Sequence, residues 1–262
     1  MAQRRLAVVT GASSGIGAAT ATALAAGGCR VVLVARGTDA LEKVAEQIRG
    51  AGGDAVVEAA DASDGEAVVA LAARVLGEHG VPGVIVNAAG AGQWHFIEDT
   101  PPAAALAMMG APYLAAFNVT HAFMPALLRA NAGVIVHVGS PASICPWPGA
   151  TAYTAARWAL RGLHEGLRQD LLGTGVVSSH VIFGEVTSPY FATNAVPRDQ
   201  LPTLNRWVRA IPPEECARVI LDVIRRPRPE VIHPPAVRWL ARGARLASPV
   251  GRWLIAQGAP RH

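Results

Sequence analysis

A glycine-rich loop near the N-terminus has the residue types and the spacing that bind a phosphate. Residues 10–17 read T-G-A-S-S-G-I-G, directly after an apolar run and directly before a run of small residues. Glycines let the backbone turn sharply and approach a pyrophosphate, and a helix that begins here presents free N–H groups and its positive dipole end. The spacing is G-x-x-x-G-x-G rather than the common G-x-G-x-x-G, but this context favours a phosphate loop over a simple tight turn.

Alternating strand and helix patterns surround this loop and would hold it at one edge of a sheet. Short apolar runs rich in β-branched residues predict strands at 6–10, 31–35, 55–58, 83–87, 133–138 and 176–182. Longer patterns rich in Ala and Leu predict helices at 15–27, 39–50, 64–79, 101–130 and 152–172. Strands that are apolar throughout are buried on both faces, as in a parallel sheet whose strands are joined by helical crossovers.

The sequence therefore predicts an α/β fold with a single Rossmann-type domain over residues 1–262. The sheet is expected to be doubly wound, seven-stranded and mainly parallel, with helices on both faces. The alternation breaks after residue 183, where five prolines between 189 and 213 predict a substrate lid at 184–213. A helix at 214–226 and a strand at 231–233 follow. Residues 236–262 form a basic amphipathic tail, which we expect over the substrate cleft or a neighbouring subunit; peripheral membrane contact is the alternative.

Composition limits the classes of protein that the chain can belong to. Its 262 residues are 51% hydrophobic and 16% charged, which excludes a disordered chain. The formal net charge is +4 without a long basic tract, so no nucleic-acid partner is expected. The three cysteines match neither a disulfide framework nor a metal cluster. We found no secretory segment and no uninterrupted apolar run of about 18 to 20 residues, and therefore expect a cytoplasmic protein without a metal.

The motifs together resemble the short-chain dehydrogenase/reductase family over nearly the whole chain. The resemblance rests on the glycine loop, Asp61 after the third strand, the N-A-A-G run at 87–90, Ser140 after the fifth strand and Tyr153 on the next helix. In this family Asp61 would hold the adenine amino group, and Asn87 and Gly90 would border its ribose. The resemblance implies that the cofactor is bound by Gly11, Ser13, Ser14, Gly15, Ile16, Gly17, Arg36, Asp61, Ala62, Asn87, Ala88, Gly90, Tyr153, Arg157, Gly184, Val186 and Ser188.

The end of the second predicted strand indicates which dinucleotide is preferred. Folds of this kind that prefer NAD place a carboxylate there, which accepts hydrogen bonds from the ribose 2′-OH. Here Ala35 occupies that place and Arg36 follows it. An arginine can pair with a 2′-phosphate through charged hydrogen bonds, and Ser13 is a second candidate contact. The family pattern therefore implies NADP(H); a solvated surface arginine is the alternative.

The resemblance assigns the chemistry to Ser140 and Tyr153. Tyr153 would protonate a carbonyl oxygen, or deprotonate an alcohol, while a hydride passes to or from the nicotinamide, and Ser140 would hydrogen-bond the same oxygen. A tyrosine needs an adjacent cation to act as a base near neutral pH. The family has a lysine four residues after the tyrosine, but this chain has Arg157, which keeps the charge and does not readily release a proton.

A second departure concerns the helix before the serine. Pro112 stands where the family has an asparagine, and Asn118 matches a different family position about two turns later. Pro112 would kink the helix, and we hypothesise that it keeps the family's kink and bound water while losing the amide. Two functions stay open: an NADP(H)-dependent oxidoreductase that interconverts a hydrophobic ketone and a secondary alcohol, or an NADP-binding protein of the same family with impaired or non-redox chemistry, such as dehydration, cyclisation or regulatory binding.

Three segments are expected to line the substrate pocket: 93–96, 143–147 and 183–191. They are apolar and aromatic, which favours a small hydrophobic carbonyl or alcohol as substrate. We interpret His95 as a surface residue and Cys145 as pocket lining. Family resemblance further implies a homodimer or homotetramer in which the helices at 101–130 and 152–172 of two subunits pack together.

Overall fold

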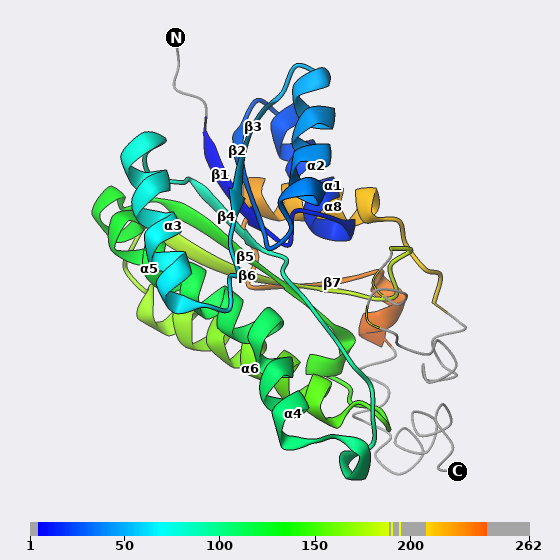
Figure 1. Cartoon of the computed structure of the whole chain (residues 1–262). Coiled ribbons are helices and arrows are strands. Elements are labelled where there is room, and N and C mark those ends of the chain that lie inside the picture. The colour runs from blue at the N-terminus through cyan, green and yellow to red at the C-terminus, as the bar shows by residue number, and fades with distance from the viewer. Residues whose placement is uncertain (1–4, 189, 191–193, 195–207, 240–262) are drawn as a thin grey trace.

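Seven parallel strands form the sheet at the centre of the protein (Figure 1). The computed structural model describes residues 5–188, 190, 194 and 208–239. The strands are β1 (Leu6–Thr10), β2 (Arg30–Ala35), β3 (Asp54–Ala59), β4 (Val84–Asn87), β5 (Gly133–Gly139), β6 (Val176–Phe183) and β7 (Glu230–His233). Their order is β3-β2-β1-β4-β5-β6-β7, and every neighbouring pair is parallel. The predicted doubly wound, Rossmann-type sheet is confirmed.

Helices cover both faces of this sheet (Figure 1). One face carries α1 (Gly15–Ala26), α2 (Thr38–Gly50) and α8 (Pro213–Arg225). The other carries α3 (Gly65–Glu78), α5 (Ala115–Ala130) and α6 (Thr151–Asp170), and α4 (Pro102–Met109) packs against α6. Short turns η1 (Ile97–Asp99) and η3 (Pro141–Ser143) lie in the loops after β4 and β5.

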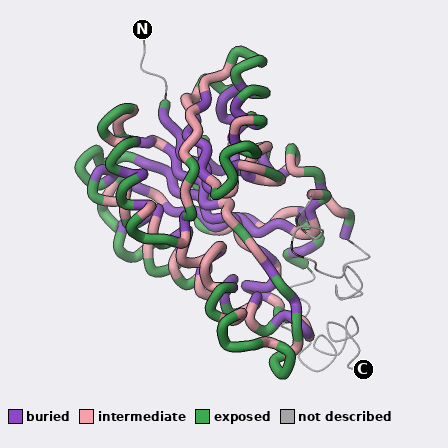
Figure 2. Tube along the Cα trace, viewed as in Figure 1, coloured by how far each residue is buried: buried purple, intermediate pink, exposed green. Residues whose placement is uncertain are grey.

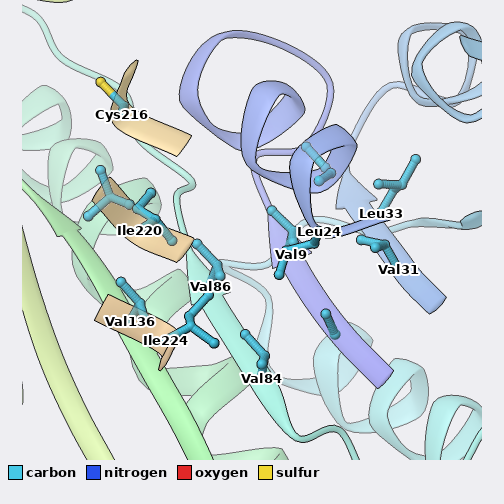
Figure 3. Close-up of a cluster of buried hydrophobic side chains, with 14 of the residues drawn as sticks. Val9, Leu24, Val31, Leu33, Val84, Val86, Val136, Cys216, Ile220 and Ile224 are labelled. Atoms are coloured by element: carbon cyan, nitrogen blue, oxygen red, sulfur yellow. The ribbon is translucent and has the colours of Figure 1, made fainter. Parts of the chain in front are cut away.

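The apolar strands supply two hydrophobic layers because successive side chains point to opposite faces. In β1, Ala7 and Val9 pack in the layer under α1 and α8, whereas Leu6 and Val8 pack in the layer under α3 and α5. Figure 3 shows the first layer, where Val9 lies between Leu24 of α1 and the side chains of α8. In Figure 2 the strands are almost wholly buried, while the outer helix faces are exposed. This two-sided burial explains why the strands lack polar alternation.

The predicted helix at 101–130 contains a widened turn. Between α4 and α5 lies a π-helical segment, η2 (Gly110–Leu114), in which Ala115 donates its N–H to the carbonyl of Gly110, five residues back. Pro112, which has no N–H to donate, lies inside this segment and is buried. A π-turn shifts the donors by one residue, so the missing N–H is bypassed without breaking the helix. The expected distortion at Pro112 is therefore found as a π-turn.

The same helix is long and apolar enough to pass a length-and-composition test for membrane-spanning segments. No uninterrupted apolar run reaches spanning length, but Pro102–Ala130 as a whole is 29 residues long with a mean hydropathy of 1.3 in its most apolar 18-residue window. By length and composition alone it could cross a bilayer. In this structure it packs against α3 and α6 and covers the sheet, as the central helix of an α/β domain does.

Only parts of the predicted lid and tail are described. Within 184–213, Val186 pairs with Ile211 in a short parallel bridge, and Ile211 donates its N–H to the carbonyl of Glu185. Residues 189, 191–193 and 195–207 of the lid and 240–262 of the tail lie outside the described residues. The described start of the tail turns back after Pro234 and buries Val237.

Three histidines are fully buried between the sheet and α6. They are His137 on β5, His164 on α6 and His180 on β6, and His164 lies 6.1 Å and 5.6 Å, between ring centroids, from the other two. The His164 Nδ1 atom is 2.8 Å from the Ser178 hydroxyl. Burial lowers the pKa of all three, well below its usual range for His137 and to about 3 for His164; the Glu230 carboxylate, 3.9 Å from the Nδ1 of His180, opposes the shift of His180. The folded protein therefore needs these rings neutral.

This cluster predicts a loss of stability in mild acid. Below the ordinary histidine pKa of about 6.5 these three imidazoles bind protons in the unfolded chain but stay neutral in the folded chain. The free energy of unfolding therefore falls as pH falls. Between pH 7 and pH 5.5 we expect a loss of about 1 kcal/mol for each buried histidine. Urea unfolding at both pH values measures it. His164→Gln should reduce the pH dependence of the free energy of unfolding by about a third, whereas His95→Gln, at an exposed position, should leave it unchanged. If both variants keep the wild-type pH dependence, the buried histidines are not its source.

Candidate active site

The carboxyl ends of the strands open into one pocket of about 800 Å³. Open parallel sheets bind ligands at this edge, where the strand order reverses, which here is between β1 and β4. The pocket is lined by every residue that the sequence predicted for catalysis or cofactor binding, with the exception of Asn87. Sequence positions from 11 to 188 thus meet at one place.

The glycine loop forms one wall of the pocket. Helix α1 begins at Gly15, and its N-cap Ser14 uses no side-chain hydrogen bond, so its first N–H groups face the pocket. A Cβ atom on Gly17 would lie 2.1 Å from the carbonyl oxygen of Gly11, and one on Gly11, whose φ is +64°, would lie 2.7 Å from that of Ala88. Only glycines permit this close packing. A tight loop before a helix N-terminus fits the pyrophosphate of a dinucleotide.

The ends of β2 and β3 form the adjoining part of the pocket. Arg36 follows β2 and lies exposed at the rim, near Ser13 and Asp61 in the pocket wall. The Asp61 carboxylate accepts hydrogen bonds from the backbone N–H and the hydroxyl of Ser63, at 2.9 Å and 2.7 Å. The Ser63 hydroxyl chiefly, with the backbone N–H and the charge of Arg36, lowers the pKa of Asp61 against the effect of burial. Asp61 is therefore held ionised and oriented beside Arg36.

Two asparagines support the pocket from behind. Asn87 turns into the core, where its Nδ2 donates to Thr120 at 3.3 Å and lies 3.3 Å from His137, so its side chain is beneath the lining and not where a ribose contact was expected. Asn118 donates to the carbonyls of Ala62 and Ser63, at 3.1 Å and 3.0 Å. It holds the loop that carries Asp61 and does not line the pocket.

Ser140 sits at the end of β5, in a turn that is clamped by α6. Its hydroxyl accepts the N–H of Ala142 at 3.3 Å. On the other side of the turn, the indole of Trp158 donates to the carbonyl of Ala142 at 3.0 Å, and Arg161 donates to that of Ser143 at 3.2 Å. Because Trp158 and Arg161 are on the same helix as Tyr153, these bonds fix the serine turn relative to the tyrosine.

Tyr153 and Arg157 form a buried pair on the first turns of α6. The guanidinium carbon of Arg157 lies 5.0 Å from the centroid of the Tyr153 ring, as expected for residues four apart on one helix face. Arg157 also donates to the carbonyl of Val138 at 3.2 Å, and a Cβ on Gly90 would lie 3.0 Å from its Nη2. Burial lowers the pKa of Arg157, but the phenols of Tyr153 and Tyr190 outweigh it and raise the pKa. The cation is permanent and adjacent to the phenol.

One part of the pocket is lined by aromatic side chains. The rings of Trp94, Trp147 and Tyr153 lie with their centroids 5.2 to 6.2 Å apart and pack with Met108 of α4. Cys145 lines the pocket and His95 is exposed outside it, both as interpreted from the sequence.

Several lining residues were missed by the sequence analysis. Tyr190 lies within the predicted pocket segment 183–191, but the sequence did not assign it a role. The others come from α4, the lid and the start of the tail, where apolar residues predicted only a helix core or a loop; they are Ala104, Ala107, Met108, Asn194, Val208 and Val237.

Comparison with known proteins identifies the fold family. The family model for short chain dehydrogenases matches residues 5–198, which is most of the chain. The chain belongs to the short-chain dehydrogenase/reductase family. Among its relatives are an uncharacterized oxidoreductase of Mycobacterium tuberculosis, 42% identical over 72% of both chains, and a short chain dehydrogenase of Pseudocercospora fijiensis, 32% identical over 71% of this chain and 61% of the relative. The chain thus spans about two thirds of the length of several curated relatives it matches.

Solved structures of the short-chain dehydrogenase/reductase family resemble this one closely. A metagenomic short-chain oxidoreductase in complex with NADP is 35% identical, with a TM-score of 0.75 over 87% of this chain and 96% of its own. An alcohol dehydrogenase of Thermococcus sibiricus complexed with 5-hydroxy-NADP is 26% identical, with a TM-score of 0.77 over 87% and 95%. A family member from Burkholderia phymatum in complex with NAD is 24% identical and shares the fold, with a TM-score of 0.85 over 99% and 98%.

Proposed function

We propose that this chain is an NADP(H)-dependent oxidoreductase that interconverts a small hydrophobic ketone and a secondary alcohol. The observation that carries the proposal is the buried Tyr153–Arg157 pair, which shares one pocket with Ser140 and the glycine loop. When bound there, the nicotinamide would supply or accept the hydride. The aromatic end of the pocket, formed by Trp94, Trp147 and Met108, supports a hydrophobic substrate.

The protein's own groups would handle the proton and the developing charge. Tyr153 would give its phenolic proton to the carbonyl oxygen during reduction and take one from the alcohol during oxidation. Ser140, held at the end of β5, would donate a hydrogen bond to the same oxygen. Arg157 would stabilise the phenolate by charge alone, since it keeps its own proton.

Tyr153→Phe tests this assignment. We expect it to abolish carbonyl-dependent oxidation of NADPH while leaving cofactor affinity nearly unchanged, because the phenol acts in the transition state. Nicotinamide absorbance with a panel of ketones measures turnover, and fluorescence titration measures affinity. Arg157→Lys should keep or raise activity, since lysine has the same charge and can also exchange a proton. Full activity in Tyr153→Phe contradicts the assignment; a wild type that binds NADPH but never consumes it indicates the non-redox alternative instead.

The preference for NADP(H) is proposed from Arg36 at the pocket rim. Ala35 leaves no carboxylate at the end of β2, and Arg36 and Ser13 both line the pocket there. Two structural neighbours carry NADP or a derivative of it in their complexes, which agrees with this choice.

Arg36→Ala should discriminate between the two dinucleotides. We expect it to weaken NADPH binding by about 1–3 kcal/mol, the range for a lost charge-assisted hydrogen bond, and to change NADH binding little. Isothermal titration with both cofactors measures the difference. Equal or tighter NADH binding by the wild type would overturn the preference.

We further propose a cytoplasmic homodimer or homotetramer assembled through α4, α5 and α6. Large apolar side chains are exposed on these helices, with Leu106, Phe117 and Trp158 at 72%, 42% and 44% exposure. No disulfide joins the three cysteines, all of which are described, as suits a reducing compartment. The basic tail remains a candidate for contact with the cleft, a neighbouring subunit or a membrane surface.

Light scattering at micromolar concentration tests the assembly. We expect an oligomer, and we expect Leu106→Glu with Phe117→Glu to shift it to smaller species because charges would be buried at the contact. Leu172→Glu, equally exposed but beyond the end of α6, serves as the control. A wild-type monomer would rule out this interface.

A further inference from the structure

A second tyrosine, Tyr190, reaches the Tyr153–Arg157 pair from the described start of the lid. Its ring packs in the same apolar cluster as Tyr153, Trp94 and Trp147, and it lines the same pocket. Three tyrosines occur in the chain, so two of them converge on one guanidinium while Tyr113 lies apart on η2.

Gly92 shows how closely the two tyrosines approach. A Cβ atom at this position would lie 2.0 Å from the hydroxyl oxygen of Tyr190 and 3.0 Å from two ring carbons, Cδ2 and Cε2, of Tyr153. The Tyr190 hydroxyl and the edge of the Tyr153 ring therefore meet over the same backbone atom. No side chain larger than hydrogen fits between the loop and the two phenols.

The backbone around Tyr190 is tied to the loop that carries Gly92. The side chain of Asn194 accepts the N–H of Gly92 at 3.0 Å and donates to the carbonyl of Tyr190 at 2.7 Å. The N–H of Asn194 also donates to that carbonyl at 3.0 Å. This clamp fixes where Tyr190 enters the pocket, so its approach to Tyr153 is built into the backbone.

Burial keeps the Tyr190 hydroxyl protonated. It raises the pKa of Tyr190, the neighbouring phenol of Tyr153 raises it further, and Arg157 lowers it in part. Tyr190 is thus a neutral donor beside a phenol that must carry negative charge after giving up its proton. Arg157 provides the positive charge of the group but stays protonated, and its Nη1 is occupied by the carbonyl of Val138.

We propose that Tyr190 is a positioning residue for Tyr153, whose hydroxyl donates a hydrogen bond to the Tyr153 oxygen and stabilises its phenolate. The proposal rests on the proposed function, in which Tyr153 is the acid and base. Tyr190 neither gains nor loses a proton in the cycle; it shares with Arg157 the work of stabilising the negative oxygen. A hydrogen bond from a neutral phenol to a phenolate is of the strong, charge-assisted kind.

Tyr190→Phe removes only the hydroxyl oxygen and is the direct kinetic test. We expect kcat to fall about 10- to 100-fold, the range for one hydrogen bond to a charged group, with KM and NADPH affinity changed less than about twofold. The midpoint of the pH dependence of alcohol oxidation should move up by about one unit, because the phenolate loses a donor. Tyr113→Phe is the matched control and should leave all of these values unchanged.

A lower KM with an unchanged or higher kcat in Tyr190→Phe would overturn the proposal, since it would mean that Tyr190 merely blocks the pocket. An unmoved pH midpoint would overturn it as well.

A double-mutant cycle tests the same contact without turnover. The free energy of unfolding of the wild type, Tyr153→Phe, Tyr190→Phe and the double variant should be non-additive, because either single change already breaks the bond. Each single change should raise the unfolding equilibrium constant by some factor. We expect the double change to raise it by a factor about 2- to 10-fold smaller than the product of the two single factors. Strict additivity would overturn the contact. A protein that shows this coupling but no hydride transfer would refute the proposed function and leave the contact established.

Discussion

One hydroxyl at the end of the first strand joins the two halves of the sheet where the pocket opens. Thr10 Oγ1 accepts the N–H groups of both Ala88 and Ala89, each at 3.1 Å. The strand order reverses between β1 and β4, so the loops after these strands leave in opposite directions and their backbone groups would otherwise lack ladder partners. By satisfying two of them, Thr10 keeps the glycine loop and the N-A-A-G run in register.

The end of the pocket that holds Tyr153 and Arg157 depends on a buried charge. An arginine inside a protein needs compensating partners, and here the carbonyl of Val138, the face of Tyr153 and the phenol of Tyr190 provide them. These partners come from β5, α6 and the lid. The guanidinium therefore links three segments that are distant in the chain, and a Cβ atom on Gly90 would lie only 3.0 Å from its Nη2.

The sequence predicted the strands and the glycine loop well because both are local patterns. A strand buried on two faces is apolar at every position, and a loop that touches a phosphate needs glycine, so each signal lies within a few residues. The roles of Ser140, Tyr153 and Arg157 were predicted from the resemblance to the family and from the spacing of these residues.

Three features could not be predicted because they depend on contacts between distant segments. The inward turn of Asn87 is set by Thr120 and His137. The place of Tyr190 is set by the Asn194 clamp to Gly92, about a hundred residues away in sequence. A proline predicts a distorted helix, but whether the helix bends, breaks or widens depends on how its two halves pack.

The widened turn at η2 also sets how far the side chains of α4 are rotated about the helix axis relative to those of α5. Each residue of a regular helix advances the side-chain direction by about 100°. Removing one residue from Gly110–Leu114 would restore ordinary spacing and rotate α4 against α5 by that angle. Met108, now in the cluster with Trp94 and Tyr153, would then turn away from the pocket while α5 stayed on the sheet. A single extra residue thus lets α4 line the pocket while α5 covers the sheet.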